Sequence, residues 1–226
     1  MRLLVGPEAP RDLTDDEVAE TYRPPDGPWL RANMVTTLDG SATGADGRSG
    51  SINNAADHVV FEALRQHADA IVVGAGTARD EGYGPAGVPL VLVSRRAEVP
   101  DRLLTDGTIL ATCAAAPGLE TARDLLGDDQ VLVLGEDTVD LTRLRPALHE
   151  RGLTSLLCEG GPRLLADLLD AHQVDELCLT TVPSLVGGDH PRILSGPRLD
   201  GRARLAGLLQ ADGTLLARWH LEGGRS

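Results

Sequence analysis

The sequence predicts an α/β fold, with a mostly parallel central sheet flanked by helices and a C-terminal antiparallel β-hairpin. Between residues 29 and 181, short apolar segments alternate with segments of helical periodicity. Such continuous apolar strands are typical of a parallel sheet that helices cover on both faces. The last stretch differs, because residues 203–210 and 214–221 flank an Ala-Asp-Gly turn and predict a hairpin. A length of 226 residues suffices for one domain of this kind.

The N-terminal residues 1–28 are predicted to be peripheral, and residues 29–226 to form a single domain. Thr14 stands before three acidic residues, a pattern typical of a capped short helix. Three prolines then favour an extended chain before Trp29. We expect the ordered part of the chain to begin at Trp29.

The remaining elements follow from apolar patterning and turn residues. The Asp39-Gly40 pair predicts a turn after the first strand, and residues 41–51, rich in Gly, Ser and Asp, predict a mobile loop. The predicted strands are 29–36, 70–73, 89–94, 108–112, 131–134, 155–158 and 175–181. The predicted helices are 53–67 (or 54–67), 119–126, 141–151 and 162–171.

Composition excludes several classes of function. The net charge is −13, Arg supplies every basic side chain, and aromatic residues make up 2% of the chain. Nucleic-acid binding needs a basic surface or stacking aromatics, so we expect no nucleic-acid partner. The three cysteines suit a reducing cytoplasm, and no apolar run is long enough for a signal peptide or a membrane span. We therefore expect a cytoplasmic protein with no membrane partner.

Three predicted strands end in glycine, at Gly74, at Gly160-Gly161 and at Gly187. Glycine at the carboxyl end of a strand lets the backbone approach a ligand, and a following helix offers free N–H groups to a phosphate. The Gly74-Ala75-Gly76 segment does not fit the Rossmann fingerprint, and a tight structural turn explains it equally well. The segment from Glu159 to Pro162 is a stronger candidate for anion binding, although close helix–strand packing would need the same small residues.

Other polar residues have both a functional and a structural interpretation. Ser94, Arg95 and Arg96 end an apolar strand, where they could hold the 2′-phosphate of NADP or form a solvated loop. Asp39 could place or protonate a substrate, or serve only in a turn. Arg65 could bind an anionic substrate or extend to solvent.

The sequence lacks the patterns of several other enzyme classes. It contains no Cys-x-x-Cys, no His-Glu-x-x-His and no zinc-deaminase motif, so we expect no metal. It also contains no Gly-x-Ser-x-Gly elbow of a serine hydrolase.

From Trp29 to the C-terminus, the chain resembles the pyrimidine reductases of riboflavin biosynthesis, which share the dihydrofolate reductase fold. The resemblance rests on the order and spacing of several motifs rather than on any one of them. These are Thr37-Leu38-Asp39-Gly40, Leu64-Arg65, Asp69 to Thr77, Glu159-Gly160-Gly161-Pro162 with Leu164, Val174 to Leu177, and Pro183 with Leu185 and Gly187.

This resemblance implies an NADPH-dependent reductase of the 5-amino-6-(5-phosphoribosylamino)uracil reductase type, in which hydride reaches the ribosyl C1′ of a pyrimidine substrate. Catalytic roles are expected for Asp39 and Glu159. Cofactor contacts are expected for Val35, Ser51, Gly74, Gly76, Thr77, Glu81, Ser94, Arg95, Arg96, Gly160, Gly161, Pro162, Arg163 and Leu164. Substrate contacts are expected for Ser49, Arg65 and Glu159. Members of the family are often dimers, so a homodimer is also expected.

Two departures from the family pattern leave alternatives open. Residues 82–88 carry no basic residue, where many members have an Arg, and we expect no fused deaminase domain, although many members carry one upstream. A dihydrofolate or other pterin reductase on the same fold would need a carboxylate on the first core helix, where Asp57 and Glu62 are the candidates. A nucleotide-binding regulator without enzymatic activity is a third hypothesis.

Overall fold

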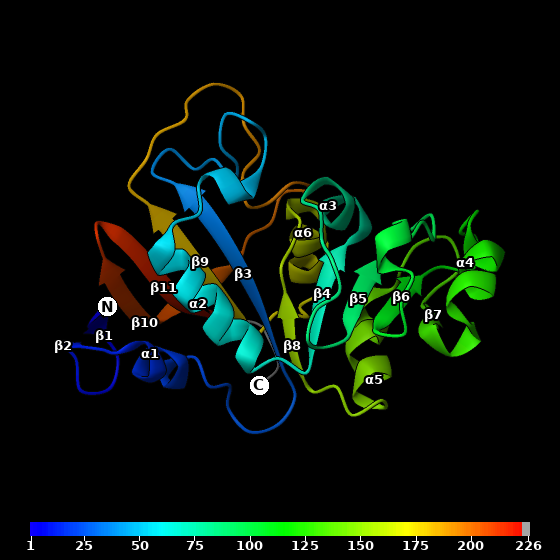
Figure 1. The fold of residues 1–226 in the computed structure, drawn as a ribbon, viewed down its shortest axis with the longest axis horizontal. Helices are drawn as coiled ribbons and strands as arrows, with labels where there is room; N and C mark the ends of the chain where they lie inside the picture. Colours follow the sequence, from blue (N-terminus) through cyan, green and yellow to red (C-terminus); the bar gives the residue numbers. More distant parts are fainter. Residues whose placement is uncertain (223–226) are drawn as a thin grey trace.

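One sheet of eleven strands forms the centre of residues 1–222, the part of the chain that the computed structural model describes (Figure 1). Its strand order is β2-β1-β10-β11-β9-β3-β8-β4-β5-β6-β7. The strands are β1 (Arg2–Val5), β2 (Arg11–Asp12), β3 (Trp29–Thr37), β4 (Ala70–Gly74), β5 (Leu90–Val93), β6 (Thr108–Thr112), β7 (Val131–Val133), β8 (Ser155–Cys158), β9 (Glu176–Val182), β10 (Arg202–Ala211) and β11 (Thr214–Glu222).

The sheet changes from parallel to antiparallel along its length. The strands from β9 to β7 pair parallel with their neighbours. β10 and β11 form an antiparallel hairpin around Asp212-Gly213, and β11 pairs antiparallel with β9. The predicted fold class is thus confirmed, including the C-terminal hairpin.

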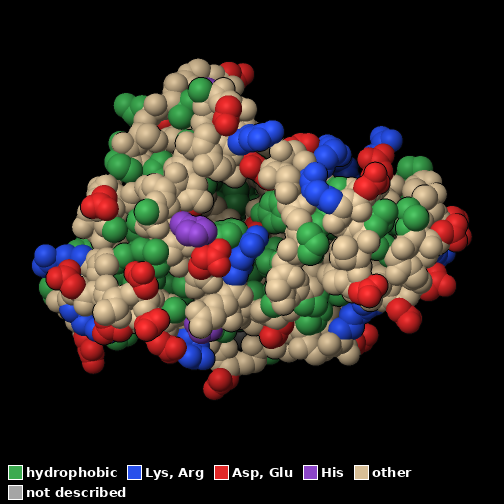
Figure 2. Space-filling view, viewed as in Figure 1, with side chains coloured by type: hydrophobic (Ala, Val, Ile, Leu, Met, Phe, Trp, Pro, Cys, Tyr) green, Lys and Arg blue, Asp and Glu red, His purple; other side chains and the backbone are tan. Residues whose placement is uncertain are grey.

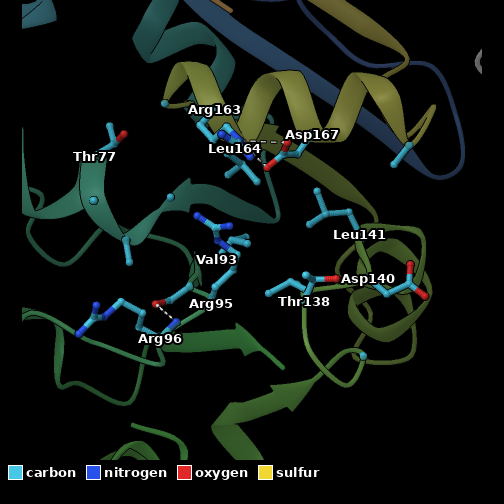
Figure 3. A pocket seen from close by; sticks show the side chains of 18 of the residues that line it. Thr77, Val93, Arg95, Arg96, Thr138, Asp140, Leu141, Arg163, Leu164 and Asp167 are labelled. Atoms are coloured by element: carbon cyan, nitrogen blue, oxygen red, sulfur yellow. Dashed lines mark hydrogen bonds and ion pairs between the residues drawn. The ribbon is translucent and has the colours of Figure 1, made fainter. Parts of the chain in front are cut away.

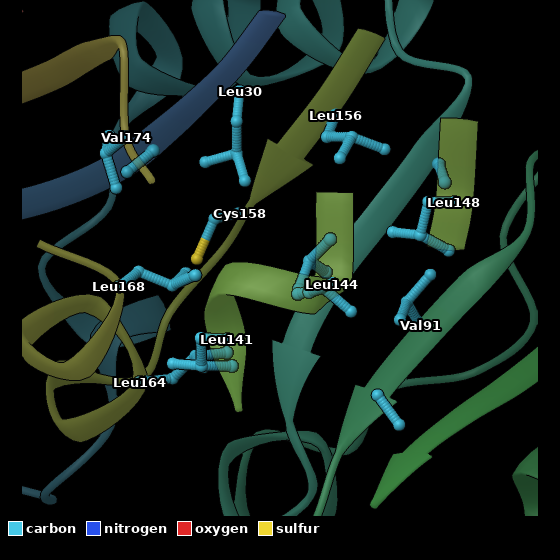
Figure 4. Close-up of a cluster of buried hydrophobic side chains, with 14 of the residues drawn as sticks. Leu30, Val91, Leu141, Leu144, Leu148, Leu156, Cys158, Leu164, Leu168 and Val174 are labelled. Carbon is cyan, nitrogen blue, oxygen red and sulfur yellow. The ribbon is translucent and has the colours of Figure 1, made fainter. Parts of the chain in front are cut away.

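Helices cover both faces of this sheet (Figure 1). They are α1 (Asp15–Thr21), α2 (Ala55–Gln66), α3 (Ala75–Asp80), α4 (Leu119–Leu126), α5 (Leu144–His149) and α6 (Pro162–Asp170). Alternation along β8 separates the faces: Leu156 packs in a cluster with side chains of α5 and α6 (Figure 4), whereas Leu157 packs with side chains of α1 and α2. Both leucines are almost fully buried, as an apolar strand of a parallel sheet requires.

The N-terminal segment is more closely integrated than the sequence predicts. β1 pairs with both β10 and β2, and Val18 of α1 and Tyr22 are buried against α2 and the hairpin. The ordered part therefore begins at Arg2 rather than at Trp29, and that prediction is wrong. The predicted cap is present, because the Thr14 hydroxyl accepts a hydrogen bond from the Glu17 N–H.

Two local predictions also need correction. The predicted helix at 141–151 consists of a 3₁₀ turn, Leu141–Arg143, followed by the shorter α5. Pro146 has no N–H to donate within a helix, so it fits only near a helix start, and α5 begins two residues before it. After Gly74 the chain forms the short helix α3 rather than only a turn.

Candidate functional site

A cavity of about 1020 Å³ lies along the carboxyl ends of β4, β5, β7 and β8. In an open α/β sheet, this edge is where ligands usually bind, because loops and helix N-termini converge there. The cavity is large enough for a dinucleotide. Its lining comprises residues 74–77, 79, 93–96, 98, 135–142, 161–164, 167, 170 and 171.

Glycines bring two loops of this cavity into direct contact. Gly74 donates its N–H to the Gly160 carbonyl at 2.9 Å, which joins the end of β4 to the end of β8. A Cβ on Gly161 would lie 2.3 Å from the Thr77 hydroxyl oxygen, so glycine is the residue that fits without a shift of Thr77. The paired glycines thus allow the β4–α3 and β8–α6 connections to touch, and this contact forms part of the cavity wall.

The N-terminus of α6 opens into the same cavity. Pro162 occupies its first turn, and the N-cap residue Gly161 offers no side chain to the free N–H groups that follow. Arg163 and Leu164, which carry two of these groups, line the cavity (Figure 3). A helix start without a side-chain cap attracts an anion such as a phosphate.

The arginines around the cavity differ in their availability. Arg96 pairs with Glu98 at 2.7 Å, and Arg163 pairs with Asp167 at 3.3 Å. Among residues 1–222, no hydrogen bond or ion pair is formed by the Arg95 guanidinium, which faces the cavity in Figure 3. The Ser94 hydroxyl accepts from the backbone N–H groups of Arg96 and Glu98 and so shapes this loop. Arg95 is therefore the side chain best placed to bind an anion here.

A second, smaller cavity of about 270 Å³ lies between α2, β3 and α3. It shares Thr77, Gly161 and Pro162 with the larger cavity, so the two spaces meet at the glycine contact. On the surface, the molecule is hollowed between the 41–51 loop and α3 (Figure 2). Ligands in the two cavities would therefore lie next to each other at these three residues.

The 41–51 loop forms one side of the smaller cavity. Ala42 donates its N–H to the Pro191 carbonyl at 2.7 Å, and Ser49 donates its N–H to the Glu81 carboxylate at 3.0 Å. All four of these residues line the cavity, as does Val35 of β3. The loop that the sequence predicts to be mobile is thus tied to α3 and to the 183–201 connection.

Glu159 lies at the wall of the smaller cavity and is nearly buried. Arg65 of α2 donates two hydrogen bonds to its carboxylate, each 2.8 Å long, and the Tyr83 hydroxyl donates a third at 2.7 Å. Burial, reinforced by the Glu159 charge, raises the pKa of Tyr83 well above its usual value, so the phenol keeps its proton. Arg65 also stacks on Phe61, 4.2 Å from the ring centre. This cluster fixes the carboxylate firmly in place.

Most of the predicted site residues line one of the two cavities, but four do not. The larger cavity is lined by Gly74, Gly76, Ser94, Arg95, Arg96, Arg163 and Leu164. The smaller cavity is lined by Val35, Ser49, Glu81 and Glu159. Both cavities are lined by Thr77, Gly161 and Pro162. Arg65 lines neither cavity but contacts Glu159 and Phe61, which line the smaller one. Gly160 packs against Met34, and Ser51 hydrogen-bonds to Asp46 outside both cavities.

Asp39, expected to be catalytic, is also outside both cavities. Its carboxylate accepts hydrogen bonds from the N–H groups of Val186 and Gly187 and from the Thr37 hydroxyl. These bonds lower the pKa of Asp39 to about 2. The structure therefore gives Asp39 a role in joining the 183–201 connection to the end of β3, and its catalytic role stays a prediction. The third strand-end glycine, Gly187, belongs to this clamp.

Replacing Asp39 by Asn should make the protein less stable at neutral pH but not in strong acid. The folded-state pKa of about 2 lies below the ordinary value of 3.8, so the ionised carboxylate contributes stability above about pH 4. This contribution is lost as the pH falls through 2. Melting temperatures of both proteins, measured from pH 7 to pH 2, should therefore converge toward the acid end. A constant difference across this range would contradict the assignment.

Sequence reasoning missed several residues of the site. Asn33 of β3 lines the smaller cavity, and its position inside an apolar strand was a usable signal. Residues 135–142 line the larger cavity, and Gly135 after β7 was another strand-end glycine. Within residues 1–222, no three His, Cys, Asp or Glu side chains are grouped to hold a metal. No helix in the same range has the length and apolar character of a membrane span.

Comparison with known proteins gives one consistent result. The family model of the RibD C-terminal domain matches residues 28–216. The 2,5-diamino-6-ribosylamino-4(3H)-pyrimidinone 5′-phosphate reductase of Methanothermobacter thermautotrophicus is 32% identical over 181 residues, covering 74% of this chain and 83% of that protein. The reductase of the same name from Archaeoglobus fulgidus is 28% identical over 200 residues, covering 79% and 91%.

A solved structure agrees with these relatives. The pyrimidine reductase-like protein of Corynebacterium diphtheriae superimposes with a TM-score of 0.75 at 27% identity. The match covers 86% of this chain and 92% of that one.

Proposed function

Because this chain belongs to the RibD C-terminal domain family, the pyrimidine reductases of riboflavin biosynthesis, we propose that it uses NADPH to reduce the ribosylamino side chain of a pyrimidine 5′-phosphate. The observation that supports this most directly is the contact between the two cavities at Thr77, Gly161 and Pro162. Hydride transfer requires a dinucleotide and a second substrate held against each other away from water. Two adjoining cavities of unequal size meet that requirement.

The residues of the larger cavity fit a reduced dinucleotide. The uncapped start of α6 offers N–H groups to its phosphates, and Gly161 allows the backbone to approach closely. Arg95, whose guanidinium has no partner among the described residues, would hold the 2′-phosphate. When bound, NADPH supplies the hydride that reduces the open-chain imine carbon of the ribosyl group.

The chain's own contribution is to orient the substrate and exclude water. Met34, Phe61 and Pro162 give the smaller cavity apolar walls, and Ala42 and Pro191 border it from the loops. Glu159, fixed by Arg65 and Tyr83, presents an immobile carboxylate at its wall. The homodimer and the cytoplasmic location that the family resemblance implies stay predictions.

The proposal is tested by measuring NADPH oxidation with a ribosylaminopyrimidine 5′-phosphate, and mass spectrometry should identify a ribitylamino product. Dihydrofolate is measured as a second substrate, because a pterin reductase is the main alternative function. Turnover of dihydrofolate alone, or nucleotide binding without turnover of either compound, would contradict the proposal.

Replacing Arg95 by Ala should weaken NADPH binding by about tenfold and leave NADH binding nearly unchanged, because only NADPH carries the 2′-phosphate. Arg96→Ala is the matched control, since Glu98 already neutralises that side chain. Dissociation constants from fluorescence titration give the result. Equal losses of affinity for both cofactors, or a larger loss for Arg96→Ala, would show that Arg95 does not bind the 2′-phosphate.

A further inference from the structure

The inner wall of the smaller cavity holds two buried polar side chains whose hydrogen bonds are incomplete. Asp57 and Asn33 both line this cavity and are 3% and 9% exposed. The Oδ1 atom of each lacks a hydrogen-bond partner among the described residues. A buried oxygen without a partner destabilises the protein, so such groups usually meet a ligand or water.

Strand register places the two side chains on the same side of the sheet. Asn33 of β3 pairs with Cys178 of β9, and Cys178 packs in the cluster with α2 side chains. Alternation along β3 puts Leu30, Ala32 and Met34 in the cluster on the other face. Asn33 therefore faces α2, the helix that carries Asp57.

The position of Asp57 on α2 favours a charged carboxylate there. Asp57 lies in the first turn of the helix, and its N–H donates to the side chain of the N-cap residue Asn54 at 3.0 Å. A negative charge near a helix N-terminus is stabilised by the helix dipole. Burial raises the pKa of Asp57 and outweighs the lowering by the Thr180 hydroxyl, but two hydrogen-bond donors from a ligand would favour the charged form.

We infer that Asp57 selects the pyrimidine ring, by accepting hydrogen bonds from the adjacent N3–H and 2-amino groups of a 2-aminopyrimidin-4-one. An ionised carboxylate offers two acceptors side by side, and this ring edge offers two donors in the same arrangement. A uracil ring has a C2 carbonyl in place of the amino group. Its oxygen would face a carboxylate oxygen of Asp57, and two acceptors in contact repel each other. Asn33 adds another acceptor in the same cavity. The inference rests on the proposed function and specifies its substrate class, a ring that still carries its 2-amino group.

The test compares two substrates that differ only at C2 of the ring: the 2,5-diaminopyrimidinone and the 5-aminouracil forms of the ribosylamino 5′-phosphate. With saturating NADPH, we expect kcat/KM of the wild-type protein to favour the 2-amino substrate by about 30-fold or more. This measurement does not depend on the folding of any variant. Equal values or a preference for the uracil form would overturn the inference alone. Turnover of neither substrate would overturn the proposed function as well.

Asp57→Asn provides an independent check. An amide presents one acceptor and one donor, which match the N3–H and C2 carbonyl of uracil and mismatch the 2-amino ring. We expect the substrate ratio to fall at least tenfold toward uracil. Glu62→Gln is the matched control, because it removes the same charge from the exposed face of α2 and should leave the ratio unchanged. A folded Asp57→Asn protein with the wild-type ratio would overturn the assignment.

Discussion

Replacing Gly161 by Ala should weaken NADPH binding at least about 100-fold, which corresponds to about 2.8 kcal/mol. The added Cβ would lie 2.3 Å from the Thr77 hydroxyl oxygen, much closer than two such atoms can approach. Either the Thr77 side chain would have to rotate or the two loops would have to separate, and both changes alter the wall shared by the two cavities. Fluorescence titration of NADPH gives the affinity, and circular dichroism establishes whether the protein remains folded.

Two further variants make this prediction specific. Gly107→Ala is the control, since a Cβ there meets no atom within 4 Å and the residue lies outside both cavities. In the double variant Gly161→Ala/Thr77→Ala, the clashing hydroxyl is gone, so part of the lost NADPH affinity should return. If Gly161→Ala bound NADPH like the wild-type protein, the glycine contact would not be part of the cofactor site.

Replacing Glu159 by Gln should lower the free energy of unfolding by about 2 kcal/mol and reduce turnover sharply. Loss of this carboxylate leaves the Arg65 guanidinium without its counter-ion. A fully buried unpaired charge would destabilise the fold by roughly 3–5 kcal/mol, but the Arg65 side chain is 30% exposed, so water screens part of the effect. Urea unfolding gives the stability, and NADPH oxidation gives the turnover.

A double-mutant cycle separates the ion pair from other effects of Glu159. Arg65→Met removes the partner charge, and the two substitutions together should be less destabilising than the sum of the single ones. Glu120→Gln is the control, because the exposed Glu120–Arg123 pair should contribute under about 0.5 kcal/mol. Additive losses in the Glu159–Arg65 cycle would show that the pair does not stabilise the protein.

The sequence predicted the architecture well where hydrophobic patterning is strong. The central parallel strands, the C-terminal hairpin and α6 with its proline start appear close to their predicted bounds. The N-terminal strands could not be predicted because β1 and β2 are short, and they form only by pairing along β10, far away in the sequence. Such pairing leaves little local pattern.

The cavities were predicted only in part, for a physical reason. Strand-end glycines at Gly74 and Gly161 signalled the wall between them, because close backbone approach needs glycine whatever the partner is. The contacts of Asp39 could not be predicted, since an Asp-Gly pair has the same local signature whether its carboxylate faces a substrate or a neighbouring loop. Asn33 in an apolar strand and Asp57 on the first core helix can be picked out in the sequence, but only the folded sheet places them in the same cavity.

The wall common to both cavities ties the two binding equilibria together. A ligand that presses on Thr77 or Pro162 from one side changes the surface that the other ligand meets. Thermodynamic linkage then requires that the factor by which dinucleotide alters substrate affinity equal the factor by which substrate alters dinucleotide affinity. Substitutions at Thr77 should shift both factors equally, whereas substitution of Arg95, which does not line the smaller cavity, should alter one affinity and leave the coupling intact.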